Sequence, residues 1–295
     1  FFFFSEEQRI DIRYPTLVST VPDANLRQGI FPIPVCINRN NTTETCTGAN
    51  VLPAGAQLPA DRLNPAAASY ISQIYNQLPL PNGPNFALTS AAVNRAEFRQ
   101  EILKIDHGFS DNWTAFYRFE NDKIPTLDAN SLFSSGGNLP GVATTETNSP
   151  GKTHTLQTTY AINPNTILEG RYAYAYGAIL SRNIGLLALS NSTNPVALPF
   201  ENTRDRITSV SGNGFGGLTS FGPYDNFSNK HSISTNLTFI SGNHTMKFGG
   251  GYSKYRKNEN ALVTDATGGN QSIFTTFDKT LPSGVTTNKL NHNLQ

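Results

Sequence analysis

The segment 230–256 reads KHSISTNLTFI, then SGN at 241–243, then HTMKFGGGYSKYR. Apolar side chains recur at every second position before and after the central triplet, with Ser, Asn, Thr or Lys between them. A period of two is the pattern of a β-strand with two different faces. Because Gly and Asn suit tight turns, the segment predicts an antiparallel hairpin whose two strands share an apolar face. That face carries Ile233, Leu237, Phe239, Met246, Phe248 and Tyr252.

Two more segments show the same organisation. Residues 100–109 and 113–122 flank a short polar connector, and so do residues 152–162 and 166–178. Long segments rich in Gly, Asn, Ser, Thr and Pro, 123–151 and 179–229, separate the three hairpins. Loops of that length are uncommon in compact soluble domains. Short turns alternating with long loops are typical of outer-membrane barrels, which have tight periplasmic turns and extended extracellular loops.

We therefore expect an all-β fold: an open, incomplete segment of an antiparallel up-and-down transmembrane β-barrel, with long extracellular loops. In the strand 166–178, Tyr172, Tyr174 and Tyr176 share the face predicted to meet lipid, opposite Glu169 and Arg171. A soluble antiparallel sandwich would alternate equally well, so the arrangement of loops is what favours the barrel.

Composition agrees with a β protein and excludes other classes. Charged residues make up 15% of the 295 residues, against about 25% in typical soluble domains. The chain has 19 Phe and 11 Tyr, and aromatic residues favour strands. The net charge is +1 with no basic stripe, so we expect no nucleic-acid partner. No apolar run is long enough for a transmembrane helix, a test that leaves transmembrane strands open.

The first long loop region, 12–98, contains the two cysteines and a predicted helix near 65–77. Cys36 and Cys46 flank a polar segment without apolar periodicity. We expect a disulfide worth roughly 2 to 3 kcal/mol in the chain-entropy model, in an oxidising compartment; two free thiols are the alternative. Asn64 can cap the helix and Pro65 fits its first position. The amphipathic helix is expected to fold over the barrel mouth.

No motif indicates catalysis, a cofactor or a metal. Residues 212–217 fit the G-x-G-x-x-G pattern, but no helix-forming sequence follows, as a dinucleotide site requires. The five histidines are isolated rather than spaced as metal ligands. A nucleophile elbow and a P-loop are both missing. We therefore expect no cofactor, no metal site and no enzymatic activity.

The hairpin 240–250, ISGNHTMKFGG, resembles the recurrent "G-x-H-T-h-K-F-G-G" hairpin (h apolar) of TonB-dependent receptors of the Oar-like, carboxypeptidase-regulatory-domain type. Other stretches resemble the family in the same order along the chain. They are 1–7 (FFFFSEE), 21–31 (VPDANLRQGIF), 58–65 (LPADRLNP), 78–82 (LPLPN), 105–111 (IDHGFSD) and 116–119 (FYRF).

The resemblance implies energy-coupled passage of a large substrate across the outer membrane of a Gram-negative bacterium, driven by the TonB complex acting on a plug. Such receptors have a plug and a barrel of about 22 strands. About eight strands and no plug are recognisable here, so residues 1–295 are expected to be a partial barrel domain. Residues 270–295 match nothing in the family and are interpreted as one strand, 271–279, with flanking loop.

The candidate substrate-facing residues are those predicted to point into the barrel lumen: Arg118, Glu120, Glu169, Arg171 and Lys247. The alternative is that these charges hydrate the barrel wall and pair with the plug. The expected partners are outer-membrane lipid, the TonB complex and an unknown large substrate. A rival function of another class is an extracellular adhesin or glycan-binding β-sandwich, in which the same loops would form the binding face.

Overall fold

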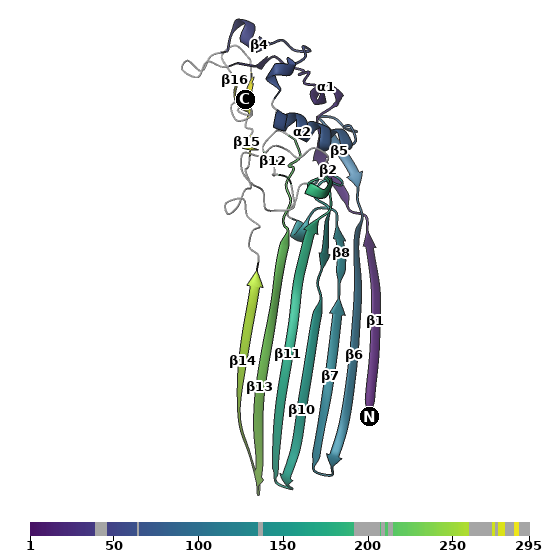
Figure 1. Ribbon diagram of the computed structural model, residues 1–295, viewed down its shortest axis with the longest axis vertical. Helices are drawn as coiled ribbons and strands as arrows, with labels where there is room; N and C mark the ends of the chain where they lie inside the picture. Colours follow the sequence, from purple (N-terminus) through teal and green to yellow (C-terminus); the bar gives the residue numbers. More distant parts are fainter. Residues whose placement is uncertain are drawn as a thin grey trace.

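The computed structural model describes residues 1–38, 46–63, 65–134, 138–191, 207, 210–211 and 215–259, and three short strands beyond them. One antiparallel sheet dominates, and the long loops cluster at one of its ends (Figure 1). We call this sheet the wall. Its strands are β1 (Phe2–Arg13), β6 (Asn94–Ser110), β7 (Trp113–Lys123), β8 (Pro125–Asp128), β9 (Thr145–Asn148), β10 (Gly151–Asn163), β11 (Thr166–Asn183), β13 (Tyr224–Ser241) and β14 (His244–Glu259).

The strands of the wall lie side by side in chain order. β1 pairs with β6, β6 with β7, β7 with β10, β10 with β11, β11 with β13, and β13 with β14, all antiparallel. β8 continues β7 after Ile124, and β9 leads into β10 across Ser149 and Pro150. A proline ring removes a ladder donor, which accounts for the second break. The expected up-and-down order is confirmed.

The short turns lie on one rim of the wall and the long loops on the other (Figure 1). Each turn has two residues between the last paired positions, which are Ser110 with Trp113, Asn163 with Thr166, and Ser241 with His244. Gly242 has φ 57°, a left-handed conformation that glycine adopts without strain. The predicted separation of turns and loops is therefore correct.

Several strands are longer than predicted. β6 begins at Asn94, β11 continues to Asn183 and β13 begins at Tyr224. The first loop region is thus shorter than 12–98, and the loop predicted over 179–229 begins only after Asn183. These extensions carry polar residues on both faces, as in Asn-Arg-Ala-Glu at 94–97. Where both faces of a strand meet water, no apolar alternation marks it.

A second correction concerns the C-terminal region, predicted as one strand over 271–279. The structure has two short strands there, β15 (Ile273–Phe274) and β16 (Phe277–Thr280), which belong to different small sheets. β15 pairs with β12 (Val210–Ser211), and β16 pairs with β17 (Thr286–Asn288). A continuous β-like sequence does not fix its partners, and here the partners change within three residues.

The loops form a structured layer that we call the cap, residues 14–93, 129–144 and 184–223 where described. It contains β2 (Thr16–Thr20), α1 (Ala24–Arg27), β3 (Val35–Cys36), β4 (Val51–Leu52), α2 (Pro65–Gln73) and β5 (Ala87–Ala91). The predicted helix is present as α2, followed by a 3₁₀ turn at Tyr75–Gln77. Its proposed cap Asn64 lies outside the described residues.

The cap has its own hydrophobic core, built from three loops that are distant in sequence. Val21 and Ile74 come from the first loop, Leu139 from the second and Leu218 from the third, and all four are fully buried. The core comprises Val21, Tyr70, Ile74, Tyr75, Leu78, Leu88, Leu139, Val142, Ala143, Leu187, Ile207 and Leu218. The loops therefore pack against one another instead of extending separately into solvent.

Candidate functional site: the two faces of the wall

One face of the wall carries an apolar surface that extends across all seven paired long strands, from β1 to β14. Directly paired residues in an antiparallel sheet point to the same side. One row of such pairs consists of Phe2, Ile105, Tyr117, Leu156, Tyr172, Ile233 and Tyr252. Their exposure is high: Leu156 is 51% exposed, Ile233 59% and Tyr252 68%. No second sheet covers this row in the described chain, so the two-sheet sandwich is excluded as the fold.

The apolar surface ends in an aromatic belt towards the loop rim. The belt combines Tyr117, His154, Tyr172, Tyr174 and His231. Tyr117 Oη lies 2.8 Å from His154 Nδ1, and Tyr172 Oη lies 2.8 Å from His231 Nδ1. Tyr174 lies between them, with ring centroids 6.0 Å from His154 and 4.9 Å from His231. Amphipathic rings of this kind are enriched where a membrane meets water.

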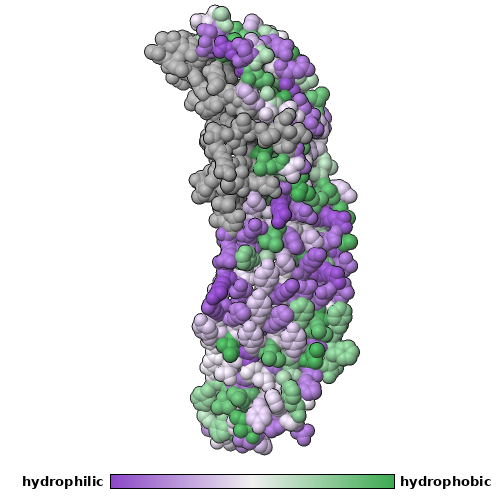
Figure 2. All heavy atoms as spheres, in the orientation of Figure 1, coloured by the Kyte–Doolittle hydropathy of each residue, from purple (hydrophilic) through white to green (hydrophobic). Residues whose placement is uncertain are grey.

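The apolar surface extends over most of the apolar thickness of a membrane. On β14 the outward residues run from Met246 through Phe248 and Tyr252 to Lys254. Eight steps of about 3.3 Å give roughly 26 Å along the strand; a strand tilt of about 40° reduces this to roughly 20 Å along the membrane normal, against an apolar band of roughly 25 Å in outer-membrane barrels. Hydrophobic residues gather at the turn end of the wall and near the start of β1, while hydrophilic residues occupy its middle and upper part in the view of Figure 2.

The other face of the wall carries all five residues predicted to face the lumen. Arg118 and Glu120 follow one another on this face of β7, and their side chains form an ion pair of 3.3 Å. Lys247 of β14 reaches across β13 to Glu169 of β11, with 3.7 Å between Nζ and Oε2. Arg171 lies on the same face, beside Gln157 and Ser234. The structure therefore places these side chains on the polar face, and four of them neutralise one another in pairs.

Further polar side chains on this face were missed at the sequence level. Gln100 Nε2 donates hydrogen bonds to Glu120 at 3.2 Å and to Asp122 at 2.9 Å. Lys104 pairs with Asp106 at 2.8 Å. Both sets belong to the first hairpin, whose alternation is the least regular because Ile102 and Phe116 also lie on the polar face. On β6, the strand that pairs with β7, polar residues at every second position around Lys104, the partner of Arg118, would have identified them.

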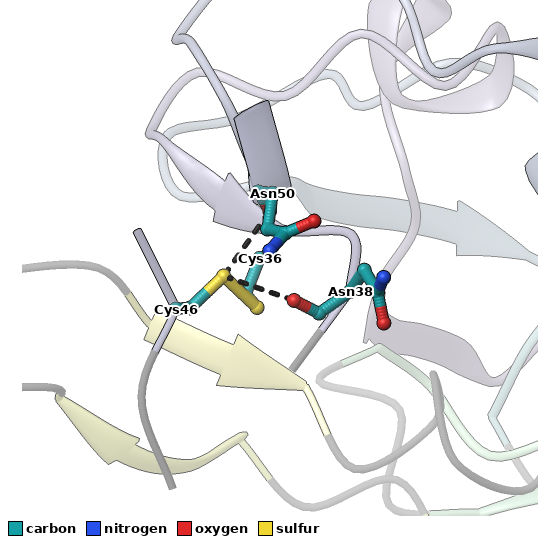
Figure 3. The surroundings of a disulfide bond; sticks show 4 residues. All are labelled: Cys36, Asn38, Cys46 and Asn50. Carbon is teal, nitrogen blue, oxygen red and sulfur yellow. Dashed lines mark hydrogen bonds between the residues drawn. A yellow bond between two sulfur atoms is a disulfide. The ribbon is translucent and has the colours of Figure 1, made fainter. Parts of the chain in front are cut away.

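The disulfide lies in the cap. Cys36 and Cys46 are bonded, with 5.9 Å between their Cα atoms, and both side chains are buried (Figure 3). The predicted pairing is thus present. Cys46 Sγ lies 3.1 Å from the carbonyl oxygen of Asn50 and 3.6 Å from that of Asn38. A bonded sulfur has no hydrogen to donate, so these are packing contacts that fix the position of the bridge between β3 and the following turn.

Arg27 connects distant parts of the cap. It lies at the end of α1, and its guanidinium donates hydrogen bonds to the carbonyl oxygens of Pro22, Leu78 and Pro79 at 2.8 to 2.9 Å. Burial lowers the pKa of Arg27 from its ordinary value, an effect that the nearby Asp23 carboxylate opposes. The pKa remains far above neutral pH for an arginine, so a charged donor holds three carbonyl groups in place.

The part of the chain that the structure describes contains no group of three or more His, Cys, Asp or Glu side chains that could hold a metal. His154 and His231 belong to the aromatic belt, and His107 stacks edge-on against Phe109. Half of the Gly-rich motif at 212–217 lies outside the described residues. No helix in those residues is long and apolar enough to cross a membrane.

An antiparallel wall with one apolar face that extends over most of a membrane's apolar thickness, one polar face, short turns on one rim and long loops on the other defines the class of membrane β-barrels. A family model described as an outer membrane beta barrel domain matches residues 1–293, so the chain belongs to that family. No curated protein and no solved structure matches it. The family places the wall in the bacterial outer membrane, with the apolar face towards lipid and the polar face towards the barrel interior.

Proposed function

We propose that this chain supplies wall and surface loops to a TonB-dependent receptor of the Oar-like type in a Gram-negative outer membrane. The observation that carries the proposal is the resemblance of 240–250 to that family's hairpin, which forms the β13–β14 turn. The structure gives a physical reason for glycine at two positions of this hairpin. Gly242 needs its φ of 57°, and a Cβ on Gly249 would lie 2.2 Å from Asn236 Oδ1. The resemblance thus extends to one position where a side chain would strain the backbone and to another where it would be crowded.

The proposed activity is binding or passage of a large substrate, without catalysis and without a cofactor. The cap would form the entry surface, and the polar face would line the path. Arg171 is the strongest candidate for a substrate contact, because no ion pair involves it among the described residues, whereas Arg118, Glu120, Glu169 and Lys247 are paired. TonB would act through a plug of the full-length protein.

The decisive experiment uses the full-length protein in detergent with the purified periplasmic domain of TonB. Native mass spectrometry should show a one-to-one complex. Deleting TonB in the host should abolish uptake while leaving surface binding intact. A folded protein that does not bind TonB would contradict the proposal.

The ordered core of the cap favours one second candidate, an adhesin. An adhesin would keep its surface binding and show no dependence on TonB. The same two measurements therefore separate the two functions.

A further inference from the structure

A group of cations lies on the lipid-facing side of the wall, at the loop end of the aromatic belt. Lys152, Tyr176, Asn229 and Arg256 are paired in one row across β10, β11, β13 and β14. Lys254 lies in the next row towards the turns, where it pairs with His231. We call Lys152, Lys254 and Arg256 the cationic patch. All three side chains are exposed.

The cationic patch has no acidic partner in the described chain. None of its three residues takes part in an ion pair there, and the outward acid on β13, Asp225, lies four residues beyond Asn229. The outward cations of β6 are different: Arg99 pairs with Glu6 and Glu101, and Arg95 pairs with Glu97. Lys123 of β7, which lies opposite Arg99 in the sheet, is exposed on the same face and takes part in no ion pair among the described residues. Unpaired positive charge therefore extends from Lys123 across β10 to β14, at the loop end of the lipid-facing side.

The level of the cationic patch is that of the outer leaflet's headgroups. Lys254 lies roughly 26 Å along the strand from Met246, the first outward apolar residue after the turn. Long loops of outer-membrane barrels are extracellular, so the patch meets the outer side of the bilayer. Lys152 and Arg256 are three strand spacings apart, about 14 Å between backbones. Two phosphates on one sugar headgroup could therefore be bound together.

An apolar groove lies on the same face between the cationic patch and the turn rim. It has a volume of about 500 Å³, and its walls include Leu156, Tyr172, Ile233 and Tyr252. Gly250 of β14 lines the groove, and a Cβ there would meet no protein atom within 4 Å. A groove of this size and lining suits a hydrocarbon chain.

We infer that this surface binds one phosphorylated glycolipid of the outer leaflet, with its phosphates on Lys152, Lys254 and Arg256 and an acyl chain in the groove. Ammonium and guanidinium groups bind phosphate by charge-assisted hydrogen bonds. Tyr176 and His231 lie between the cations and offer polar tips to the sugar. The inference rests on the outer-membrane family and is independent of TonB.

The test uses the full-length protein in nanodiscs of phosphatidylcholine containing a few per cent of diphosphorylated lipid A. After transfer to detergent, native mass spectrometry counts the glycolipid that stays bound. The wild-type protein should retain one molecule. A variant with Lys254→Glu and Arg256→Glu should retain it at least tenfold less, because two attractive contacts become repulsive. Gly250→Leu should also reduce retention, because the new side chain would occupy the groove from a position where its Cβ meets no protein atom within 4 Å.

Lys230→Glu is the control: it reverses one charge on the polar face of β13, as each substitution of the double variant does on the lipid-facing side, and should leave retention unchanged. Folding of each variant is checked by its heat-dependent migration on detergent gels, and Arg256→Gln replaces the double variant if that fails to fold. Equal retention by folded wild type and charge variant would overturn the inference. Displacement by inorganic phosphate, or equal retention of phosphatidylglycerol, would overturn the assignment to a glycolipid.

Discussion

At the scale of single residues, successive side chains along each strand of the wall point alternately to the lipid-facing side and to the polar face. On β13, Ile233 points to lipid, while its neighbour Ser232 points to the polar face, where its hydroxyl lies 2.9 Å from that of Ser253. A charge is therefore tolerated at one position and costly at the next. This alternation is the physical basis for assigning the two faces.

Ile233→Arg is expected to destabilise the folded protein by about 1 to 2 kcal/mol, because the side chain faces lipid one row below the level of His231 and Lys254, between the midplane and the interface, where the cost of a charge falls. Ser232→Arg is the control and should cost much less. Unfolding in urea from detergent or lipid vesicles measures both. Equal losses would show that the two faces have been assigned wrongly.

The disulfide is a second feature of single residues with a measurable effect. Replacing Cys36 and Cys46 by Ser should remove roughly 2 to 3 kcal/mol of constraint on the loop between them. Because the bridge lies in the cap, the wall should stay folded while proteases cut near 39–45 more readily. Peptide mapping under non-reducing conditions checks the bond itself, and two alkylated thiols in the wild type would contradict it.

At the scale of elements, short helices and strands of the cap are too small to be stable alone, and their shared hydrophobic core and the hydrogen bonds between them supply the missing stability. Buried hydroxyl and amide groups join the second loop to the third, β9 to β11, and the third loop to the wall. Ser131 Oγ lies 3.3 Å from Ser220 Oγ, and Thr147 Oγ1 donates to Ser181 Oγ at 3.0 Å. Asn183 also donates to Ser220. The cap is thus anchored to the strand ends by a polar network.

Arg27→Ala should loosen the cap without unfolding the wall. The substitution removes the donor from the carbonyl groups of Pro22, Leu78 and Pro79. The first two are partly buried and cost about 1 to 3 kcal/mol each when left unsatisfied, whereas the exposed Pro79 carbonyl can bond to water. Hydrogen exchange should rise in residues 20–30 and 74–88 and stay unchanged in β10 and β11. Arg62→Ala, at an exposed cap position, is the control. Unchanged exchange in the first variant would refute the anchoring role of Arg27.

At the scale of the whole molecule, the wall exposes on one side the residues that a soluble protein would bury. The hydrophobic core of the described chain lies mainly in the cap, whereas Leu156, Ile233 and Tyr252 on the wall are more than half exposed. Exposing this face to water is therefore unfavourable. Contact with lipid tails removes that cost, and the paired backbone of the sheet satisfies its own hydrogen bonds within the bilayer.

The full-length protein should accordingly fractionate with the outer membrane and require detergent for extraction. Once folded in detergent it should migrate faster on gels before heating than after heating, because a closed barrel resists unfolding by the detergent. Fractionation of cell lysates and paired heated and unheated samples provide the measurement. Recovery as a monodisperse soluble protein without detergent would contradict the membrane assignment.

The sequence by itself determined the hairpins, their two faces and the separation of turns from loops. These features depend on neighbours two residues apart and on turn residues, so a local pattern is sufficient to predict them. All five residues predicted on the polar face, Arg118, Glu120, Glu169, Arg171 and Lys247, lie there for this reason. Strand ends at Asn183 and Tyr224 were missed because polar strands above the membrane lack alternation.

Only the tertiary structure decided how distant segments meet. Val21, Leu139 and Leu218 form one core although more than 75 residues separate each from the next along the chain, and their loops look polar because isolated apolar residues carry no periodic signal. The pairing of Lys247 with Glu169 and the gathering of Lys152, Lys254 and Arg256 likewise depend on strand register. Register is set by pairing across the sheet, which a single strand's sequence does not contain.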